Sequence, residues 1–364
     1  MKNTLGNNVT VSIFGESHGK AIGVLIDGVA PGIDVDEEYI GEILSLRRPV
    51  GSISTARQEK DEFSILSGVF EGKTTGTPIC ITIPNADTKS KDYSQMKSVA
   101  RPSHADYSAQ CKYHGFQDYR GGGHFSGRIT AALCAAGAIF LSALSKKGIE
   151  IGTHIKKCAG VSDREFKVLC DDIKALSKKQ FAVLDDLQGE KMQEKIKEAK
   201  AEGDSVGGVL ETAVIGLPAG LGEPFFDSIE SLISHAVFSI PAVKGIEFGA
   251  GFEICDKKGS EANDAFYVED GAVKVRTNNS GGINGGITNG APILFKTAIR
   301  PTPTISKEQQ TVDFEKMQNT TISAGGRHDP CIVHRARIVV DSITAIVLAD
   351  ALSGCYGTDW LGEK

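Results

Sequence analysis

Several common signals are missing from this 364-residue sequence, and each absence narrows what the protein can be. Its eight cysteines include no C-x-x-C pair, which argues against a zinc site or a thioredoxin-like motif and favours reduced thiols in the cytosol. A formal net charge of −6 provides no basic field to attract nucleic acid or an anionic membrane. Any anionic ligand must therefore meet locally clustered cations, and no metal site is expected.

The sequence also lacks a signal peptide and a long apolar run. Its most apolar segment, residues 129–144, is shorter than the roughly 20 residues that span a bilayer. We interpret this segment as a buried helix and expect a cytoplasmic protein that has no membrane partner.

Glycine, by contrast, is abundant, with 42 residues, and part of it recurs in two matching stretches. Residues 15–33 align without gaps on 203–221, and residues 67–81 align without gaps on 281–295. This order predicts one domain of two pseudo-symmetric halves, at about 10–145 and 200–352, joined by a connector at about 146–199.

Each half has the pattern strand, strand, helix, strand, strand, helix. The predicted strands include 9–14, 21–26, 78–83 and 291–299, and the predicted helices include 36–48, 129–144, 227–240 and 342–352. Because strands and helices do not alternate, a Rossmann sheet is excluded. We expect an α+β fold with an antiparallel sheet and helices in each half, and a solvated charged helix at 185–204 in the connector.

Five of the eight histidines lie in polar stretches, rich in glycine or arginine, that read as loops: His18, His104, His124, His328 and His334. In RPSHADY, a carboxylate and a cation flank His104, which can tune its pKa for acid–base work near neutrality. The alternative interpretation is that Ser103 and Asp106 cap a helix. Five such histidines together favour a catalytic site.

Glycines and arginines also cluster in a way that suits anions. In DYRGGGHFSGR, Gly121 to Gly123 expose bare backbone, and charged or polar donors surround them. Three arginines, Arg47, Arg48 and Arg57, follow a helix, and each offers a planar fork of donors that fits phosphate or carboxylate. The alternative, a partner for the dipole at the C-terminus of that helix, accounts for one of them and not for all three. The polar glycine run 278–290 could wrap a planar or phosphorylated ligand, or could be a flexible loop.

Taken together, GESHG, RPSHADY, DYRGGG and GRHDPC resemble the signature segments of chorismate synthases, in the same order and across nearly the whole chain. The resemblance implies a lyase of the shikimate pathway that converts 5-enolpyruvylshikimate 3-phosphate to chorismate and phosphate by anti 1,4-elimination. It also implies reduced FMN (FMNH2) as cofactor without net oxidation, a β-α-β sandwich of two similar halves, and a homotetramer.

The resemblance further implies roles for individual residues. His18 would donate a proton to the departing phosphate, His104 would stabilise or protonate the reduced flavin, and Asp329 would help flavin N5 remove the ring proton. The implied substrate-binding residues are Arg48, Arg57, Arg101, Arg128 and Arg335. The implied cofactor-binding residues are His124, Phe125, Ser126, Pro241, Ala242, Gly282, Arg300, Pro301, Thr302, Pro303, Thr304 and Arg327.

Two of these positions depart from the family pattern, which commonly has arginine at the place of His124 and lysine at the place of Arg300. No G-x-G-x-x-G occurs between a strand and a helix, so we expect NADPH to act only indirectly, through an external flavin reductase. The competing hypotheses are a flavin-dependent oxidoreductase on a phosphorylated substrate and a phosphate-ligand binding protein.

Overall fold

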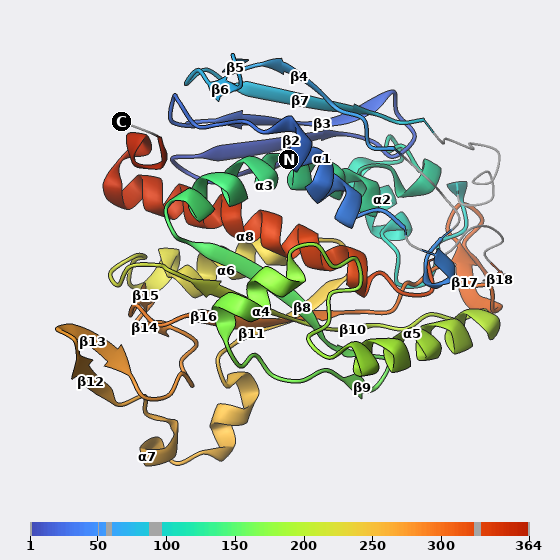
Figure 1. Ribbon diagram of the computed structural model, residues 1–364. Coiled ribbons are helices and arrows are strands. Elements are labelled where there is room, and N and C mark those ends of the chain that lie inside the picture. Colours follow the sequence, from blue (N-terminus) through green and yellow to red (C-terminus); the bar gives the residue numbers. More distant parts are fainter. Residues whose placement is uncertain (1, 50, 56–59, 87–96, 324–328, 363–364) are drawn as a thin grey trace.

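The chain folds into two antiparallel sheets with helices between them (Figure 1). The structure is a computed structural model that describes residues 2–49, 51–55, 60–86, 97–323 and 329–362. The predicted α+β class, with antiparallel sheets and packed helices, is confirmed.

The first sheet contains five strands, in the order β1-β2-β3-β7-β4. In chain order they are β1 (Thr4–Leu5), β2 (Thr10–Gly15), β3 (Ala21–Asp27), β4 (Ser64–Ser67) and β7 (Ile79–Pro84). In β7 the alternate residues Ile79, Ile81 and Ile83 are fully buried, as a strand with one face on a core requires. The strands predicted at 9–14, 21–26 and 78–83 are thus present.

The second sheet also contains five strands, in the order β11-β16-β10-β8-β9. They are β8 (Glu150–Cys158), β9 (Val161–Ser162), β10 (Gly208–Ile215), β11 (Val243–Phe248) and β16 (Ile293–Ile299). Two of them, β8 and β9, come from the stretch interpreted as a connector. The strand β8 buries polar side chains, since the Thr153 hydroxyl donates to Asp341 over 2.6 Å, and this polarity hid the strand in the sequence.

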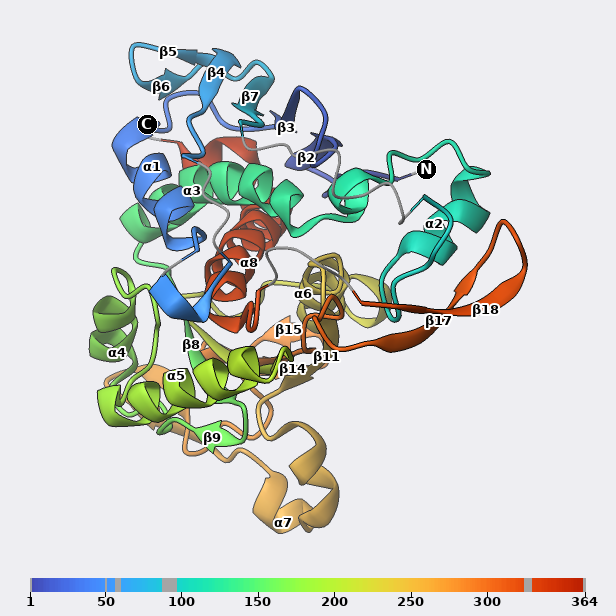
Figure 2. The ribbon, with the colours of Figure 1, turned by 90° about the vertical axis from the view of Figure 1, so that its right-hand side faces the viewer.

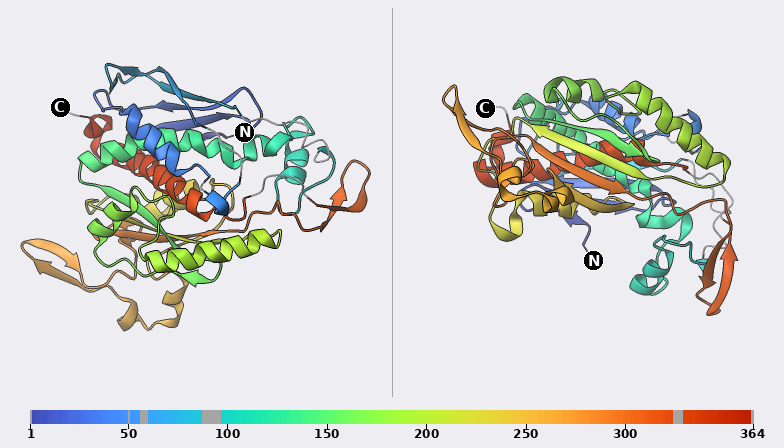
Figure 3. Two further views of the ribbon diagram at one scale, coloured as in Figure 1. Left: turned by 45° about the vertical axis from the view of Figure 1, so that its right-hand side comes forward. Right: turned by 90° about the horizontal axis from the view of Figure 1, so that it is seen from below.

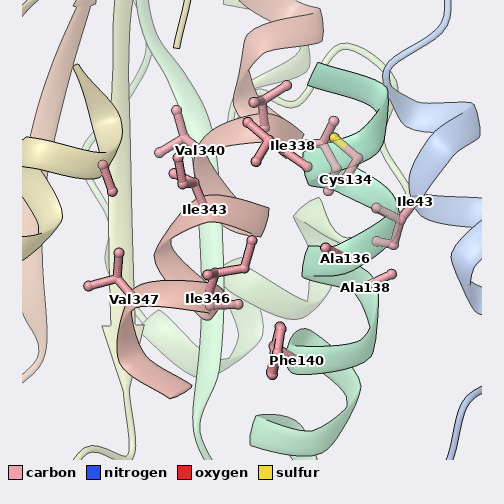
Figure 4. Packing of buried hydrophobic residues seen from close by; sticks show 14 of the residues in the cluster. Ile43, Cys134, Ala136, Ala138, Phe140, Ile338, Val340, Ile343, Ile346 and Val347 are labelled. Carbon is pink, nitrogen blue, oxygen red and sulfur yellow. The ribbon is translucent and has the colours of Figure 1, made fainter. Parts of the chain in front are cut away.

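Four helices form the layer between the sheets: α1 (Glu37–Leu46), α3 (Thr130–Lys146), α6 (Ile229–Val237) and α8 (Val333–Tyr356). The two long helices α3 and α8 approach each other closely where they cross. Gly137 permits this, since a Cβ added there would lie 2.3 Å from the Cβ of Ser342. Apolar side chains such as Phe140 of α3 and Ile346 of α8 fill the surrounding core (Figure 4). The helices predicted at 36–48, 129–144 and 227–240 are confirmed, and the one predicted at 342–352 begins earlier.

Length and composition alone would allow 127–146 and α8 to cross a membrane. However, 78% and 83% of their most apolar windows are buried inside the structure. Such burial between two sheets is typical of core helices, as predicted for residues 129–144.

The remaining elements lie around this sandwich. The helix α2 (Asp106–Tyr113) and the hairpin of β17 (Gln309–Asp313) and β18 (Gln318–Ile322) project together at one end (Figure 2). The helices α4 (Leu169–Leu176) and α5 (Asp186–Ala201) border the second sheet, and α7 (Gly259–Ala262) and the hairpin of β12 (Phe266–Glu269) and β13 (Ala272–Val275) extend away from it (Figure 3). The short strands are β5 (Val69–Phe70), β6 (Lys73–Thr74), β14 (Ile283–Asn284) and β15 (Ile287–Thr288), and the 3₁₀ helices are η1 (Gly51–Ile53), η3 (Arg120–Phe125), η4 (Gly127–Ile129), η5 (Phe225–Asp227), η6 (Gly251–Asp256) and η7 (Thr358–Leu361).

The charged helix expected at 185–204 is α5, and one of its faces is not solvated. Met192 and Ile196 are fully buried on that face. A charged helix whose apolar residues are four positions apart packs that narrow stripe against the protein.

Candidate active site

A cavity of about 330 Å³ opens where the start of α8 meets loops from both sheets. Many predicted site residues line it: His104, Phe125, Ser126, Arg128, Pro241, Ala242, Arg300, Thr302, Pro303, Thr304, Asp329 and Arg335. Residues from distant parts of the sequence, from His104 to Arg335, therefore line one cavity. The lining also includes Arg47, one of the three arginines expected to suit an anion, and Asp61, which the sequence did not indicate.

The glycine triplet 121–123 brings two histidines against this loop. All three glycines have positive φ, between +53° and +84°. A Cβ added at Gly121 would lie 2.2 Å from Cε1 of His18, and one added at Gly122 would lie 3.2 Å from Cε1 of His104. Besides exposing backbone, the glycines therefore leave the space that both imidazole rings need.

His18 lies in a buried turn directly after β2. Its Nδ1 is 3.1 Å from the Ser17 hydroxyl, and the backbone N–H of Ser17 donates to the Gly123 carbonyl over 3.1 Å. The amide of Asn85 donates to the carbonyls of Glu16 and Gly19 at 2.9 and 3.0 Å. These bonds fix the turn against the glycine loop, and the His18 residue is only 7% exposed.

His104 forms a charge-supported pair with Asp106. Its Nδ1 is 2.7 Å from Oδ1 of Asp106, and Arg101 binds the same carboxylate through Nε (2.8 Å) and Nη2 (2.7 Å). Burial acts to raise the pKa of Asp106, but the bonds from Arg101 and His104 outweigh it and hold that pKa below its ordinary value. Because an ionised carboxylate only accepts, Nδ1 carries the proton and Nε2 is left for chemistry.

The capping alternative for this segment is wrong. The N-cap of α2 is Ala105, which makes no side-chain capping bond, and Ser103 has a φ of +58°. The Asp106 carboxylate instead accepts the backbone N–H of Arg101 and pairs with His104. It therefore positions the histidine and does not cap the helix.

Asp329 lies at the entrance of α8 with both carboxylate oxygens engaged. Oδ1 accepts the backbone N–H of Thr55 at 2.8 Å, and Oδ2 accepts Nη1 of Arg335 at 2.6 Å. Arg335 also donates through Nε to the Arg47 carbonyl at 2.8 Å. Burial lowers the pKa of Arg335, and the nearby Asp329 carboxylate partly offsets this effect.

Arg128 crosses the opposite wall and binds three acceptors. Its Nε donates to Oδ1 of Asn85 at 3.0 Å, Nη2 donates to the Pro84 carbonyl at 3.0 Å, and Nη1 pairs with Asp61. Arg47 reaches the second oxygen of the same carboxylate, with Nη2 3.2 Å from Oδ2 of Asp61. A buried Arg–Asp–Arg cluster therefore forms part of the cavity wall.

Other predicted site residues lie outside this lining, and His18 is one of them. Arg48 donates to the Lys60 carbonyl, Arg101 is paired with Asp106, and His124 donates from Nδ1 to the Gly15 carbonyl over 2.7 Å. Gly282 packs closely against Pro292, and Pro301 packs beside Gly207. Arg57 and Arg327 fall outside the described residues, as does His328.

The expectation that His334 belongs to a polar loop is wrong. It lies in the first turn of α8, fully buried, with Nε2 2.9 Å from the Ser54 hydroxyl. The helix begins nine residues before the apolar stretch that predicted it, so Arg335 also lies inside α8. The first turns of α8 carry polar residues, which interrupt the apolar periodicity by which a helix is recognised in a sequence. The start of the helix was therefore missed.

Comparisons with known proteins agree with this geometry. The family model described as chorismate synthase matches residues 9–353. A chorismate synthase from Archaeoglobus fulgidus is 47% identical over 353 residues, covering 96% of this chain and 97% of the relative. One from Pyrococcus abyssi is 46% identical over 347 residues, covering 95% and 96%.

A solved structure, "Crystal Structure of Chorismate Synthase", superimposes with a TM-score of 0.75 at 30% sequence identity and covers 97% of this chain and 94% of that one. The sequence relatives and the shared fold lead to the same assignment: the chain belongs to the chorismate synthase family.

Proposed function

We propose that the cavity at the start of α8 is the active site of this enzyme, a cytoplasmic lyase that converts 5-enolpyruvylshikimate 3-phosphate to chorismate in the final step of the shikimate pathway. The observation that carries the proposal is convergence: Asp329, His104, Arg128 and Arg335 face one cavity from separate segments. A phosphate-binding protein would need the arginines alone, without an Asp-paired histidine beside them.

The wall from the second half of the chain fits a flavin mononucleotide. Ile240, Pro241 and Ala242 supply an apolar surface for a planar ring. Nearby, the Thr302 hydroxyl is buried without a hydrogen-bond partner in the described chain, and it can bind a polar edge. Reduced FMN, which this family requires, supplies transient electron density to the reacting substrate when bound.

Arg300 is the residue that we assign to the flavin phosphate. Its guanidinium makes no ion pair within the described residues, and burial lowers its pKa. Burial removes water from the Arg300 guanidinium, and a bound anion would compensate for this loss by pairing with the charge. His124 gives its Nδ1 proton to the Gly15 carbonyl, so we assign it to fixing the glycine loop.

His18 is the proposed acid for the departing phosphate. The Ser17 hydroxyl lies 3.1 Å from Nδ1 and helps to hold the ring in place. A protonated phosphate leaves more readily, and the fixed turn holds the acid in one orientation.

His104 is the proposed proton holder on the flavin side of the cavity. The Asp106 carboxylate fixes the tautomer with Nδ1 protonated, so Nε2 is the nitrogen that would exchange a proton with the flavin. Because Arg101 also binds this carboxylate, the pair is held in place before the ligands arrive.

Asp329 is the residue proposed to assist the removal of the substrate's ring proton. Two donors hold its carboxylate, the Thr55 N–H and the Arg335 guanidinium, so its orientation is set before substrate arrives. Arg128 and Arg335 would bind anionic groups of the substrate, with Arg48, Arg57 and Arg101 as further candidates.

An anaerobic assay with chemically reduced FMN and 5-enolpyruvylshikimate 3-phosphate tests the proposed site. We expect equal release of phosphate and chorismate with the flavin still reduced at the end. Asp329→Asn should lower turnover by about 10²-fold or more. Unchanged turnover in this variant would place the chemistry elsewhere.

The halves are proposed to be pseudo-symmetric repeats within a single domain. Support comes from the strand orders, which run β2-β3-β7-β4 in one sheet and β8-β10-β16-β11 in the other. This correspondence assigns β8 to the second half, although it lies in the stretch of about 146–199 interpreted as a connector. Expression of residues 1–146 as a separate chain should fail to give a folded protein, because α3 packs on α8.

The enzyme is further proposed to form a homotetramer and to receive reduced flavin from an external reductase. Neighbouring aromatic side chains that are almost fully exposed, Phe225 (85%) and Phe226 (92%), support burial against another subunit. Light scattering should give four times the monomer mass. Sustained aerobic turnover by the pure enzyme with FMN and NADPH would overturn the reductase proposal.

A further inference from the structure

Asp61 is a buried carboxylate that joins two arginines of the cavity wall. Its side chain is completely buried, with Oδ2 3.2 Å from Nη2 of Arg47 and Oδ1 paired with Nη1 of Arg128. We propose that Asp61 is a positioning residue for substrate binding, which holds Arg47 and Arg128 as one preformed anion receptor. The inference rests on the active site proposed above.

Electrostatics explains why the two arginines need this carboxylate. Two guanidiniums in a buried wall repel each other and lose hydration, which costs free energy unless an anion compensates. Burial acts to raise the pKa of Asp61, but the charges of Arg47 and Arg128 outweigh it and hold that pKa below its ordinary value. The carboxylate therefore stays ionised, and the three groups together keep one net positive charge for an anionic substrate.

Hydrogen bonds around the cluster fix the planes of both guanidiniums. Arg128 also binds Asn85 and the Pro84 carbonyl, and Arg47 donates through Nη1 to the Gly127 carbonyl over 3.4 Å. In Arg47 the Nε–H is buried and has no partner in the described chain. A preformed fork with a donor still unsatisfied binds phosphate or carboxylate at a lower ordering cost.

The backbone conformation at Asp61 also supports a positioning role for this residue. Its φ is +53°, in the left-handed region that costs most side chains energy but that aspartate and asparagine tolerate better. The preceding carbonyl, of Lys60, accepts a hydrogen bond from Arg48. The chain is thus turned so that one short carboxylate reaches both arginines, and Asp61→Asn can remove the charge without new backbone strain.

The test compares Asp61→Asn with two reference variants under anaerobic steady-state conditions with reduced FMN. Asp61→Asn should raise KM for 5-enolpyruvylshikimate 3-phosphate by about tenfold or more and change kcat by less than about threefold, because the receptor and not the acid–base groups is altered. Arg128→Gln should raise KM by at least as much. Adding Asp61→Asn to Arg128→Gln should then raise KM much less than it does alone.

The matched control is Asp172→Asn, which removes a buried carboxylate from another arginine. Asp172 pairs with Arg164 at 2.5 Å, and neither residue lines the cavity. This variant should lower the melting temperature and leave KM unchanged. The same pattern in Asp61→Asn would mean a structural role and would overturn the inference.

The two proposals fail in different ways. If Arg128→Gln raises KM but Asp61→Asn does not, the positioning role is wrong and the active site stands. If neither variant changes KM, the proposed site is itself wrong, and the inference falls with it. Additive effects in the double variant would also contradict the inference, since they would show that Asp61 does not act through Arg128.

Discussion

Two buried ionic clusters in this enzyme have similar chemistry and different access to solvent. One lines the cavity and contains Arg47, Asp61, Arg128, Asp329 and Arg335. The other lies on the second sheet, away from the cavity, and contains His154, Lys156, Asp163 and Glu211. Burial and charge are thus common to both, and the ability to meet a ligand distinguishes them.

His154 of the second cluster and His104, which lines the cavity, show how the two regions differ. His154 is 2.8 Å from Asp163 through Nδ1 and 2.9 Å from Glu211 through Nε2. Since both carboxylates only accept, both nitrogens carry protons, and the ring has no position left for acid–base work. His104 engages a carboxylate through Nδ1 alone and lines the cavity.

The largest expected effect follows from removing the proposed acid that lies against the glycine loop. His18→Ala should lower kcat by about 10²-fold or more, the usual scale for a lost acid–base group. His154→Gln should lower the melting temperature and leave kcat per folded enzyme unchanged. Anaerobic turnover with reduced FMN, normalised to folded protein by circular dichroism, measures both. Equal losses of kcat in the two variants would contradict the prediction that His18 acts in catalysis and His154 in stability alone.

The next largest effect tests the close approach of the glycine loop to His18. Gly121→Ala should lower kcat by about tenfold or more, because the new Cβ would overlap the His18 ring, and small displacements of reacting groups are costly. Gly72→Ala is the control: it has a similar φ of +74° with no atom within 4 Å of the new Cβ. That variant carries backbone strain without the clash, so it should lose stability and keep its kcat.

Local motifs in the sequence predicted much of the site, because a short segment carries each motif. GESHG, RPSHADY and the glycine triplet hold His18, His104 and their immediate partners within a few residues. The helices α1, α3 and α6 were likewise readable from their apolar periods. The order of the motifs and their resemblance to one family supplied the reaction.

Long-range pairing decided what the sequence could not reveal. Asp61 lies in the charged run EKDEF, where no motif marks it, and in the structure it is buried between Arg47 and Arg128. Asn85 follows β7 with no motif around it, and its role comes from the carbonyls of Glu16 and Gly19 that it meets in three dimensions. In β8, a buried polar face hid the strand.

The cluster around His154 should make the free energy of unfolding depend on pH. Burial acts to lower the pKa of His154, but Asp163 and Glu211 outweigh it and raise the pKa above its ordinary value. The stabilisation is therefore fully present below the unfolded-state pKa of about 6.5, and it is lost as pH rises through the higher folded-state value. Urea unfolding measured at about pH 6.5 and at successively higher pH should show this loss of stability. His154→Gln should flatten this loss, and an unchanged slope would contradict the assignment.

The smallest expected effect concerns the cation proposed to bind the flavin phosphate. Arg300→Lys keeps the positive charge and loses the fork, so the FMN dissociation constant should change by less than about threefold. Arg300→Ala removes the charge and should weaken FMN binding by about tenfold. Lys156→Ala removes a cation from the cluster around His154 and should leave FMN affinity unaltered. Flavin fluorescence titration measures all three, and a loss in Lys156→Ala as large as in Arg300→Ala would mean that distant charge, and not contact at the cavity, governs FMN binding.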